Sequence, residues 1–387
     1  MLGAIAIGAV RRIAPRQAGL AGMLLVSLSI VAGSGSAATM PAEWDELVAA
    51  AQREGKVELI LSGQVPMRLR TVMPAFEKKY GVRVNFQTGG GSAHGERIVA
   101  ERRLGRFTID IWLGGQNTPV VYLLPINALA PVAELLVDPE VKDPSLWFNG
   151  RHYYTDVEGR YIFTWGAAPS HTISYNTKLV DPAELKSWAD VLNPKWQGKI
   201  VSWSPAAQST AATSAALYLL PQVGEQWFRR YVTEMKPTFV TDARQGAEWV
   251  ALGRFPIGLF GLNTQAESLK DQGLPISDYL PHALAEGEIL SASAGNIMML
   301  DRAPNPNAAK LFINWALSRE GQALFIKAAE KTDTLRRDVS NDVIEPQYRI
   351  NPKANYYVPF ADPAYIERKT AIMKTLKSIV QEAGYRD

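Results

Sequence analysis

The sequence predicts an α/β protein in which mostly parallel β-sheets are flanked by helices. Two observations lead to this prediction. Strand-like and helix-like segments alternate along the chain, and 387 residues exceed the usual size of a single domain. Hydrophobic residues make up 47% and charged residues 20%, which is typical of globular proteins and not of disordered ones. We therefore expect two α/β domains.

The first part of the chain contains three strand candidates separated by two helix candidates. The strand candidates have short apolar or alternating patterns, and each helix candidate follows a polar loop. Gly81 marks the end of the first helix. The strands are expected at 57–61, 82–86 and 109–113, and the helices at 67–80 and about 95–104. This order implies parallel pairing with right-handed crossovers.

A second α/β region begins near Thr172. One of its helices is uncharged and rich in alanine, and the last two helices of the chain have one apolar face each. The strands are expected near 173–175, 199–203, 239–240 and 257–260, and the helices near 206–220, 306–318 and 360–385.

The N-terminal residues have the order of a secretory signal peptide. Three arginines precede an apolar stretch from Ala18 to Ala32, and small residues follow. We expect residues 1–37 to be removed by cleavage near Ala37 or Ala38, which places the mature protein in the periplasm. An uncleaved membrane anchor is the alternative, but the apolar run of about 15 residues is shorter than the roughly 20 that span a bilayer.

Charge and cysteine content exclude several function classes. The formal net charge is +3, and the three leader arginines account for it, so that 3 − 3 leaves the mature chain near neutrality. A neutral protein has no field that attracts nucleic acid or anionic lipid, and we expect neither as a partner. The absence of cysteine excludes a disulfide framework, a thiolate metal site and a cysteine nucleophile.

Small, uncharged polar loops follow several of the predicted strands. In open parallel sheets, ligands bind outside the carboxyl ends of the strands. Two of these loops lead into helices, whose first N–H groups and positive dipole end favour a small anion. For the Gly-rich loop, a flexible turn with a serine cap is the alternative. The candidate ligand contacts are Ser62, Gln64, Gly90, Gly91, Ser92, Gln116, Ser204, Ser209 and Thr210.

Three further side chains have two interpretations each. Arg244 follows a strand candidate and would clamp a carboxylate or phosphate bidentately, or else pair on the surface with Asp242 or Glu248. His94, in the Gly-rich loop, either touches the ligand or is solvated. Trp203 either stacks on a ligand or is a buried aromatic.

Catalytic and metal-binding motifs are missing from the sequence. None of the four histidines has the spacing of a zinc site, and neither a nucleophile elbow nor a phosphate-binding P-loop occurs. We therefore predict no catalytic residue, no metal ligand and no cofactor.

Several short segments, taken together in their order and spacing, resemble one protein family. They are Trp44 to Val57, Thr88 to Ser92, Ile173 to Leu179, Asn193 to Ile200, Ser293 to Asn296 and Asn305 to Lys310. In these segments the chain after the leader resembles periplasmic solute-binding proteins of ABC importers, in the broad extracellular family that includes the ferric-iron binders.

The resemblance implies a type II periplasmic-binding-protein fold, in which two α/β lobes joined by crossover strands hold one solute in a cleft. The first lobe would comprise 41–165 and 292–330, and the second 166–291 and 331–387. The lobes would close on the solute by a hinge motion. A monomer would then deliver the solute to an ABC permease with its ATPase subunits.

The chain departs from the iron binders at one place. Those proteins resemble one another in an adjacent tyrosine pair that ligates ferric ion, and Leu262-Asn263 stands at the corresponding position. The pairs Tyr153-Tyr154 and Tyr356-Tyr357 lie elsewhere in the order. Because ferric ion requires anionic oxygen ligands, we expect a small organic anion or phosphorylated compound instead, with Asn263 as a further contact. Ferric-ion binding and a secreted hydrolase on the same frame remain the alternatives.

Overall fold

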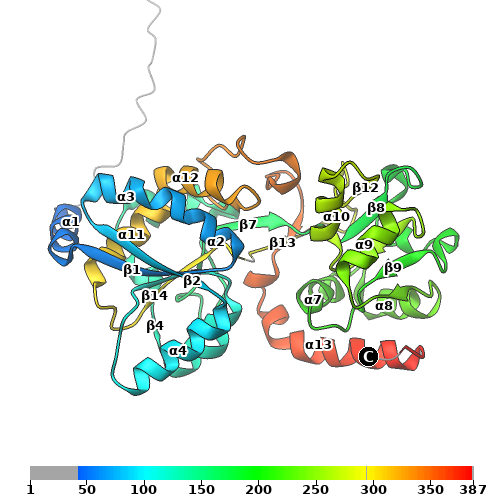
Figure 1. The fold of residues 1–387 in the computed structure, drawn as a ribbon, viewed down its shortest axis with the longest axis horizontal. Coiled ribbons are helices and arrows are strands. Elements are labelled where there is room, and N and C mark those ends of the chain that lie inside the picture. Colours follow the sequence, from blue (N-terminus) through cyan, green and yellow to red (C-terminus); the bar gives the residue numbers. More distant parts are fainter. Residues whose placement is uncertain (1–41, 293, 386–387) are drawn as a thin grey trace, which may run out of the picture. The chain divides into compact units, whose positions relative to one another are not determined.

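The computed structural model describes residues 42–292 and 294–385 (Figure 1). The predicted signal peptide at 1–37 and its cleavage site lie outside these residues. Among the helices of the described ranges, none has both the length and the apolar character needed to cross a bilayer.

The first β-sheet has the strand order β2-β1-β3-β14-β6-β5, and β4 also pairs with β14. As predicted, β1 pairs in parallel with both β2 and β3, whereas β14 runs antiparallel to β3. The strands are β1 (Lys56–Ser62), β2 (Arg83–Gly89), β3 (Ile111–Gly114), β4 (Leu129–Ala130), β5 (Tyr153–Tyr154), β6 (Phe163–Thr164) and β14 (Asn296–Leu300).

Helices cover both faces of the first sheet. Figure 1 shows α4 on one side and α2, α3, α11 and α12 on the other. The bounds are α1 (Ala42–Glu54), α2 (Gln64–Leu69), α3 (Met73–Tyr80), α4 (Gly91–Arg103), α5 (Val132–Leu135), α6 (Pro139–Lys142), α11 (Pro306–Leu317) and α12 (Arg319–Ala329).

The helix predicted at 67–80 is divided in the structure. A 3-10 turn at Arg70–Val72 separates α2 from α3, and a proline stands in the first turn of α3, where its missing N–H costs least. Gly81 ends α3 in the left-handed conformation with φ of 69°, as a glycine C-cap requires.

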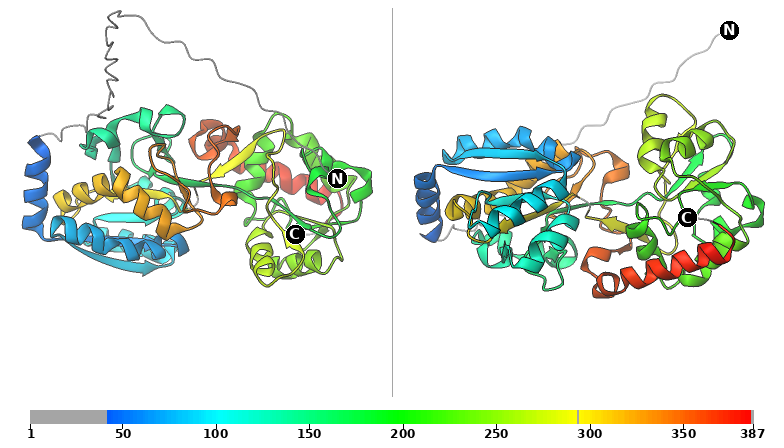
Figure 2. Two further views of the ribbon diagram at one scale, coloured as in Figure 1. Left: turned by 90° about the horizontal axis from the view of Figure 1, so that it is seen from above. Right: turned by 60° about the horizontal axis from the view of Figure 1, so that its bottom comes forward.

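The second sheet has the order β10-β9-β11-β8-β12. Its three strands β9, β10 and β11 are parallel, whereas β8 and β12 run antiparallel to their neighbours. The helix α13 packs against α7 and α8 (Figure 2). The bounds are β8 (Ile173–Asn176), β9 (Ile200–Ser202), β10 (Thr238–Phe239), β11 (Ile257–Leu259), β12 (Ile276–Ser277), α7 (Ala211–Leu219), α8 (Gly224–Thr233), α9 (Ala243–Ala251), α10 (Asn263–Asp271) and α13 (Pro363–Glu382).

A third, small sheet has the order β15-β7-β13-β16. The chain passes from the first sheet through β7 into the second sheet and returns through β13. It passes to the second sheet's helices once more, from α12 by way of β15 and β16 to α13, so this sheet contains all three passages. Its strands are β7 (Gly166–Pro169), β13 (Glu288–Ser291), β15 (Asp333–Thr334) and β16 (Tyr356–Tyr357).

Separate hydrophobic clusters form around the two larger sheets. One gathers the buried residues of the first sheet and α11, and two others gather those of the second sheet and its helices. Leu335, Ile350 and Phe360 pack in the first cluster, although the sequence analysis assigns 331–387 to the second lobe. Packing in this segment therefore does not follow the expected boundary at residue 330.

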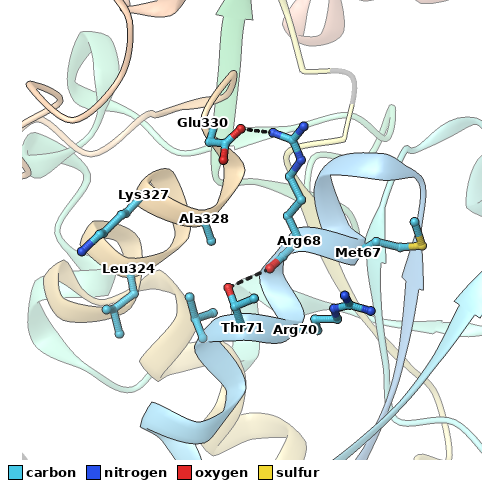
Figure 3. A pocket seen from close by; sticks show the side chains of 9 residues that line it. Met67, Arg68, Arg70, Thr71, Leu324, Lys327, Ala328 and Glu330 are labelled. Carbon is cyan, nitrogen blue, oxygen red and sulfur yellow. Dashed lines mark hydrogen bonds and ion pairs between the residues drawn. The ribbon is translucent and has the colours of Figure 1, made fainter.

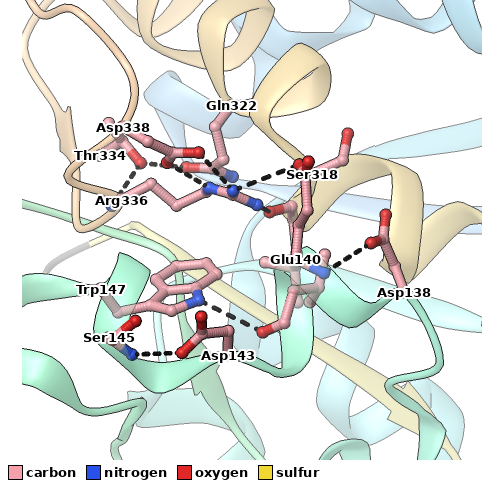
Figure 4. A network of polar contacts seen from close by, with 12 residues as sticks. Asp138, Glu140, Asp143, Ser145, Trp147, Ser318, Gln322, Thr334, Arg336 and Asp338 are labelled. Atoms are coloured by element: carbon pink, nitrogen blue, oxygen red, sulfur yellow. Dashed lines mark hydrogen bonds and ion pairs between the residues drawn. The ribbon is translucent and has the colours of Figure 1, made fainter. Parts of the chain in front are cut away.

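The buried Arg336 fastens this segment to the first cluster (Figure 4). Its guanidinium donates to both carboxylate oxygens of Asp338, at 2.8 and 2.7 Å, and to the Leu317 carbonyl oxygen at 3.0 Å. The same guanidinium lies 5.7 Å from the ring centroid of Trp147. A buried cation is thus paired bidentately and hydrogen-bonded, which is the condition under which burial of a charge is tolerated.

We expect Arg336→Leu to lower the free energy of unfolding by about 3 kcal/mol, because the change leaves Asp338 and the Leu317 carbonyl without their donor. Urea unfolding followed by circular dichroism measures this loss. The matched control is the neighbouring exposed Arg337→Leu, which should change stability by less than about 0.5 kcal/mol. Equal effects of the two variants would contradict the anchoring role.

Candidate functional site

One row of small or polar residues crosses the first sheet where its parallel strands end. Strand pairing aligns Ser62 with Gly89 on one side and with Gly114 on the other, and aligns Asn296 with Thr164. The Asn296 side chain donates to the Gly114 carbonyl oxygen at 3.1 Å and so links the Asn296–Thr164 pair to the other three residues. We call these five residues the carboxyl-edge row.

Close backbone approach explains the glycines next to this row. A Cβ on Gly114 would lie 2.5 Å from the Ser62 carbonyl oxygen. A Cβ on Gly91 would lie 2.5 Å from Thr118 Oγ1 and 3.2 Å from Ser62 Oγ. The predicted contacts Ser62 and Gly91 therefore lie side by side, together with a hydroxyl, that of Thr118, which the sequence analysis did not single out.

The Gly-rich segment is the junction of a strand and a helix and not a free loop. β2 continues to Gly89, Gly90 is the N-cap of α4, and Gly91 and Ser92 form its first turn. The helix expected from residue 95 thus begins four residues earlier. No side chain caps α4, and the first N–H groups of a helix have no acceptor within the helix. Gly90 and Ser92 are exposed, so this helix start is reachable by a ligand.

In the second sheet, three parallel strands also end at one edge. Ser202 is aligned with Phe239 and with Leu259, so the loops that follow β9, β10 and β11 leave the sheet together. The loop after β9 contains the predicted contacts Ser204, Ser209 and Thr210, and Arg244 and Asn263 stand at the starts of the helices that follow β10 and β11.

The hydroxyl group of a residue within the loop before α7 fixes the conformation of that loop. Thr210 is 3% exposed, and its hydroxyl donates to the carbonyl oxygens of Ser204, at 2.8 Å, and Ala207, at 3.0 Å. This turn delays the helix predicted from residue 206 until Ala211. The Thr210 hydroxyl closes the loop, whereas Ser209 is exposed and Ser204 is half-buried.

Arg244 forms a surface ion pair. Its Nε donates to Glu248 Oε1 at 2.8 Å one helical turn later, and its side chain is 69% exposed. The start of α9 is capped by Asp242, which accepts from the N–H groups of Arg244 and Gln245. The structure thus contains the surface pairing that the sequence analysis names as the alternative, and the anion clamp stays a prediction.

The start of α10 lies beside Trp203. Gly261 has a positive φ of 73°, and a Cβ there would lie 2.5 Å from Cε3 of the half-buried Trp203 ring. Asn263 is the first residue of α10 and half-buried, and no side chain caps this helix. Trp203 therefore packs against the loop that presents Asn263.

The predicted contacts therefore lie at two sheet edges. We call the carboxyl ends of the parallel strands in the first sheet, with the loops that follow them, the first edge, and those of the second sheet the second edge. Gln64, the first residue of α2, follows β1, and Gln116 follows β3, so both belong to the first edge. Sequence reasoning missed Thr118, Asn296 and Thr164, whose roles depend on pairing between strands distant in sequence. The one available signal was Asn296, a polar residue directly before the apolar run of β14.

His94 packs beneath the first edge. Its ring meets Trp112 edge-on with centroids 6.2 Å apart, and its Nε2 would lie 2.9 Å from a Cβ on Gly89. Burial, together with the nearby Arg97, lowers the pKa of His94. We interpret it as a neutral ring that supports α4, and not as a solvated loop residue.

A small pocket of about 40 Å³ lies where the chain passes between the second and third sheets, and His171, Asp278 and Glu288 line it. Asp278 is 5% exposed, and no hydrogen bond from another described residue reaches its carboxylate. Burial raises the pKa of Asp278, although His171 acts in the opposite direction. Burial also raises the pKa of Glu288. Two desolvated carboxyl groups therefore lie at the crossovers.

A wider pocket of about 660 Å³ lies between α2 and α12 (Figure 3). Arg68, Arg70, Lys327 and Glu330 line it, and Arg68 pairs with Glu330. Because it contains none of the predicted ligand contacts, we do not assign the site there.

The paired tyrosines are desolvated or hydrogen-bonded to other residues. Tyr153 is 1% exposed, and burial raises the pKa of Tyr154. Tyr356 accepts from the Asn351 N–H, and burial raises its pKa to about 12, while Tyr357 donates to Asp362 at 2.6 Å. Within residues 42–292 and 294–385, no cluster of three His, Asp or Glu side chains has the geometry of a metal site.

We expect Gly114→Ala to lower the free energy of unfolding by about 1–3 kcal/mol, because the added methyl group forces β3 away from the Ser62 carbonyl. Thermal and urea unfolding measure the loss. Gly90→Ala is the control, since a Cβ at Gly90 meets no atom within 4 Å. A stable Gly114→Ala protein would show that the close approach is not needed.

A second expectation concerns pH. Because the folded state raises the pKa of Asp278, the folded protein holds more protons than the unfolded one between about pH 4 and that raised pKa, and stability falls as pH rises through this window. Asp278→Asn should therefore raise the melting temperature at pH 7 by about 2 °C or more, with the gain vanishing toward pH 4. The exposed Asp271→Asn serves as control; a gain that does not change with pH would count against burial as the cause.

Comparisons with known proteins identify the family and the fold of the chain. Residues 68–323 match the family model of bacterial extracellular solute-binding proteins. The Fe(3+)-binding periplasmic protein of Serratia marcescens is 24% identical over 280 residues, which cover 69% of this chain and 75% of that protein.

Two solved structures share the fold. The iron- and citrate-bound protein of Trichodesmium has a TM-score of 0.63 at 20% identity and covers 86% of this chain and all of its own. The fructose-6-phosphate-bound periplasmic protein of Actinobacillus pleuropneumoniae has a TM-score of 0.50 at 22% identity, covering 84% and 97%. These likenesses confirm the predicted type II periplasmic-binding-protein fold. Since the family model covers more than half of its residues, the chain belongs to the bacterial extracellular solute-binding protein family.

Proposed function

We propose that this protein is the substrate-binding component of an ABC import system and captures a small anionic solute without changing it chemically. The observation that carries the proposal is the first edge, where the Ser62 and Thr118 hydroxyls lie beside the uncapped start of α4. Helix starts and hydroxyls donate hydrogen bonds to anions without requiring a counter-charge.

The second edge offers the same chemistry. The starts of α7 and α10 also lack side-chain caps, and Ser204, Ser209 and Asn263 stand at or before them. None of these side chains is acidic. An anion held between such edges would receive N–H, hydroxyl and amide donors from both sheets.

The chain already contains a helix start that binds a carboxylate. The Glu54 carboxylate accepts from the backbone N–H of Ala308 at 2.7 Å and of Asn307 at 3.2 Å, in the first turn of α11. The Asn307 side chain adds a third donor at 2.7 Å. The proposed ligand would occupy the start of α4 in the same manner.

The proposal includes two lobes, 41–165 with 292–330 and 166–291 with 331–387, that close on the solute by a hinge at the third sheet. The segment around Arg336 is the exception to these bounds: it would move with the first lobe, because Arg336 donates to the Leu317 carbonyl oxygen. An exported monomer, released from a signal peptide at 1–37, would present the closed form to a permease with its ATPase subunits. The family consists of transport proteins, and no catalytic step is part of the proposal.

Ferric ion is the second candidate, because one similar protein is named for Fe(3+) binding and one similar structure contains iron and citrate. In this chain Leu262-Asn263 stands where the iron binders resemble one another in a tyrosine pair. Both tyrosine pairs of this chain have other partners or are buried. We therefore favour an anion, and we include citrate because it is itself an anion.

A thermal-shift panel tests the anion class. We expect one of inorganic phosphate, fructose 6-phosphate or citrate to stabilise the protein, by about 2.7 kcal/mol at one hundred times its dissociation constant. Isothermal titration should give one ligand per protein. Ser62→Ala should weaken this binding about three- to tenfold, whereas the remote, exposed Ser340→Ala should not. Stabilisation by cations alone would overturn the proposal.

The absorption of visible light by the protein tests whether it binds ferric ion. Ferric ion bound by phenolate oxygens absorbs visible light, so we expect the protein mixed with ferric citrate and then desalted to remain colourless. Metal analysis of the same sample should find less than one iron per chain. A coloured protein that loses its colour on Tyr356→Phe or Tyr154→Phe would establish iron binding by tyrosine in place of anion capture.

A further inference from the structure

Asn296 lies between Gly114 and Thr164 in the carboxyl-edge row and is fully buried. Its Oδ1 accepts from the Thr164 hydroxyl at 3.0 Å. Its Nδ2 donates to the Gly114 carbonyl oxygen at 3.1 Å and to Gln116 Oε1 at 3.3 Å. All the hydrogen-bonding atoms of this amide are therefore engaged.

The orientation of this amide follows from its partners. A backbone carbonyl only accepts, so the Asn296 atom that faces the Gly114 oxygen must be the nitrogen. The Asn296 oxygen then faces Thr164, whose hydroxyl donates. The second N–H of Asn296 points to Gln116, and that side chain must present its oxygen.

The amide of Gln116 is thereby oriented as well. Its Oε1 is occupied, and its Nε2, on the other side of the amide carbon, has no partner in the described part of the chain. Gln116 is half-buried and stands two residues beyond Gly114, which is paired with Ser62. What this side chain offers to the site is two N–H donors.

Asn296 also covers the acceptors of this edge. The Gly114 carbonyl and Gln116 Oε1 would each repel an anionic oxygen, and both accept from Asn296. The hydroxyls of Ser62 and Thr118 do not decide the sign of the ligand, because a hydroxyl rotates to donate or to accept. Besides the N–H groups at the start of α4, the amide pair is thus the element at this edge with a fixed polarity.

We propose that Asn296 is a selectivity-determining positioning residue: by holding Gln116 with its nitrogen toward the ligand and by covering two acceptors, it leaves the first edge with fixed N–H donors and with hydroxyls that can donate, so that this edge takes an anion and rejects a cation. The inference rests on the proposed function and names the residue that sets its charge preference. Thr164 fixes Asn296 in turn, from β6.

Isothermal titration with citrate and with inorganic phosphate tests the proposal. Gln116→Glu keeps the shape but turns an acceptor toward the ligand, and it should weaken anion binding at least tenfold. Gln272→Glu adds the same charge at the exposed end of α10 and should leave affinity unchanged. Equal affinities of the Gln116→Glu and wild-type proteins would overturn the proposal.

A double-mutant cycle separates positioning from general damage. Asn296→Ala should weaken binding about fivefold when Gln116 is present and less than twofold in a Gln116→Ala background, where only the Gly114 carbonyl oxygen is left uncovered. A purely structural role predicts the same loss in both backgrounds, and that result would overturn the proposal. Melting temperatures of all four proteins show how far each is folded.

A measurement without ligand covers the case in which Asn296→Ala does not fold. In nitrogen-15 spectra of the wild-type protein, the side-chain NH₂ of Asn296 should exchange slowly with water, whereas that of Gln116 should exchange fast. Slow exchange at Gln116 would mean that its amide is reversed. If the amides behave as expected but no anion in the panel binds, the proposed function fails and the selectivity assignment fails with it. If anions bind but the cycle shows no coupling, only the assignment fails.

Discussion

The site depends on a steric constraint at the end of β3, where the backbone of Gly114 lies so close to β1 that a Cβ would stand 2.5 Å from the Ser62 carbonyl oxygen. Only glycine permits this approach. It lets the chain after β3 bring Thr118 over the start of α4, where Gly91 makes a second close contact. Backbone N–H groups and hydroxyls therefore lie together at this edge.

The polarity of this edge comes from how its hydrogen bonds are distributed. The donors of the α4 start have no side-chain cap, whereas the acceptors beside them, the Gly114 carbonyl and Gln116 Oε1, are used by Asn296. At α9 and α13 the opposite holds, because Asp242 and Asp362 cap the first turns with their own carboxylates. An anionic solute at the first edge would accept from the first N–H groups of α4, as those aspartates do at α9 and α13.

Sequence reasoning predicted the parallel pairing of β1, β2 and β3 and the gathering of loops at their carboxyl ends, because apolar periodicity reports burial along each strand. It placed the start of α4 too late, since three consecutive glycines have weak helix propensity although Gly91 begins the helix. It did not find Asn296 or Thr118. The position of Asn296 follows from a strand that returns about 180 residues later, as the Asn296–Gln116 contact shows, and that of Thr118 follows from the pairing of β1 with β3. Local patterns contain no information on such pairing.

The most direct test of the account is a crystal structure of the protein with the anion that stabilises it best. The account predicts an anionic oxygen within hydrogen-bond distance of Ser62 Oγ and of a backbone N–H in the first turn of α4, with the Gln116 nitrogen facing it. Density for the anion at the pocket between α2 and α12 would contradict the account, and so would a metal ion held by tyrosine oxygens.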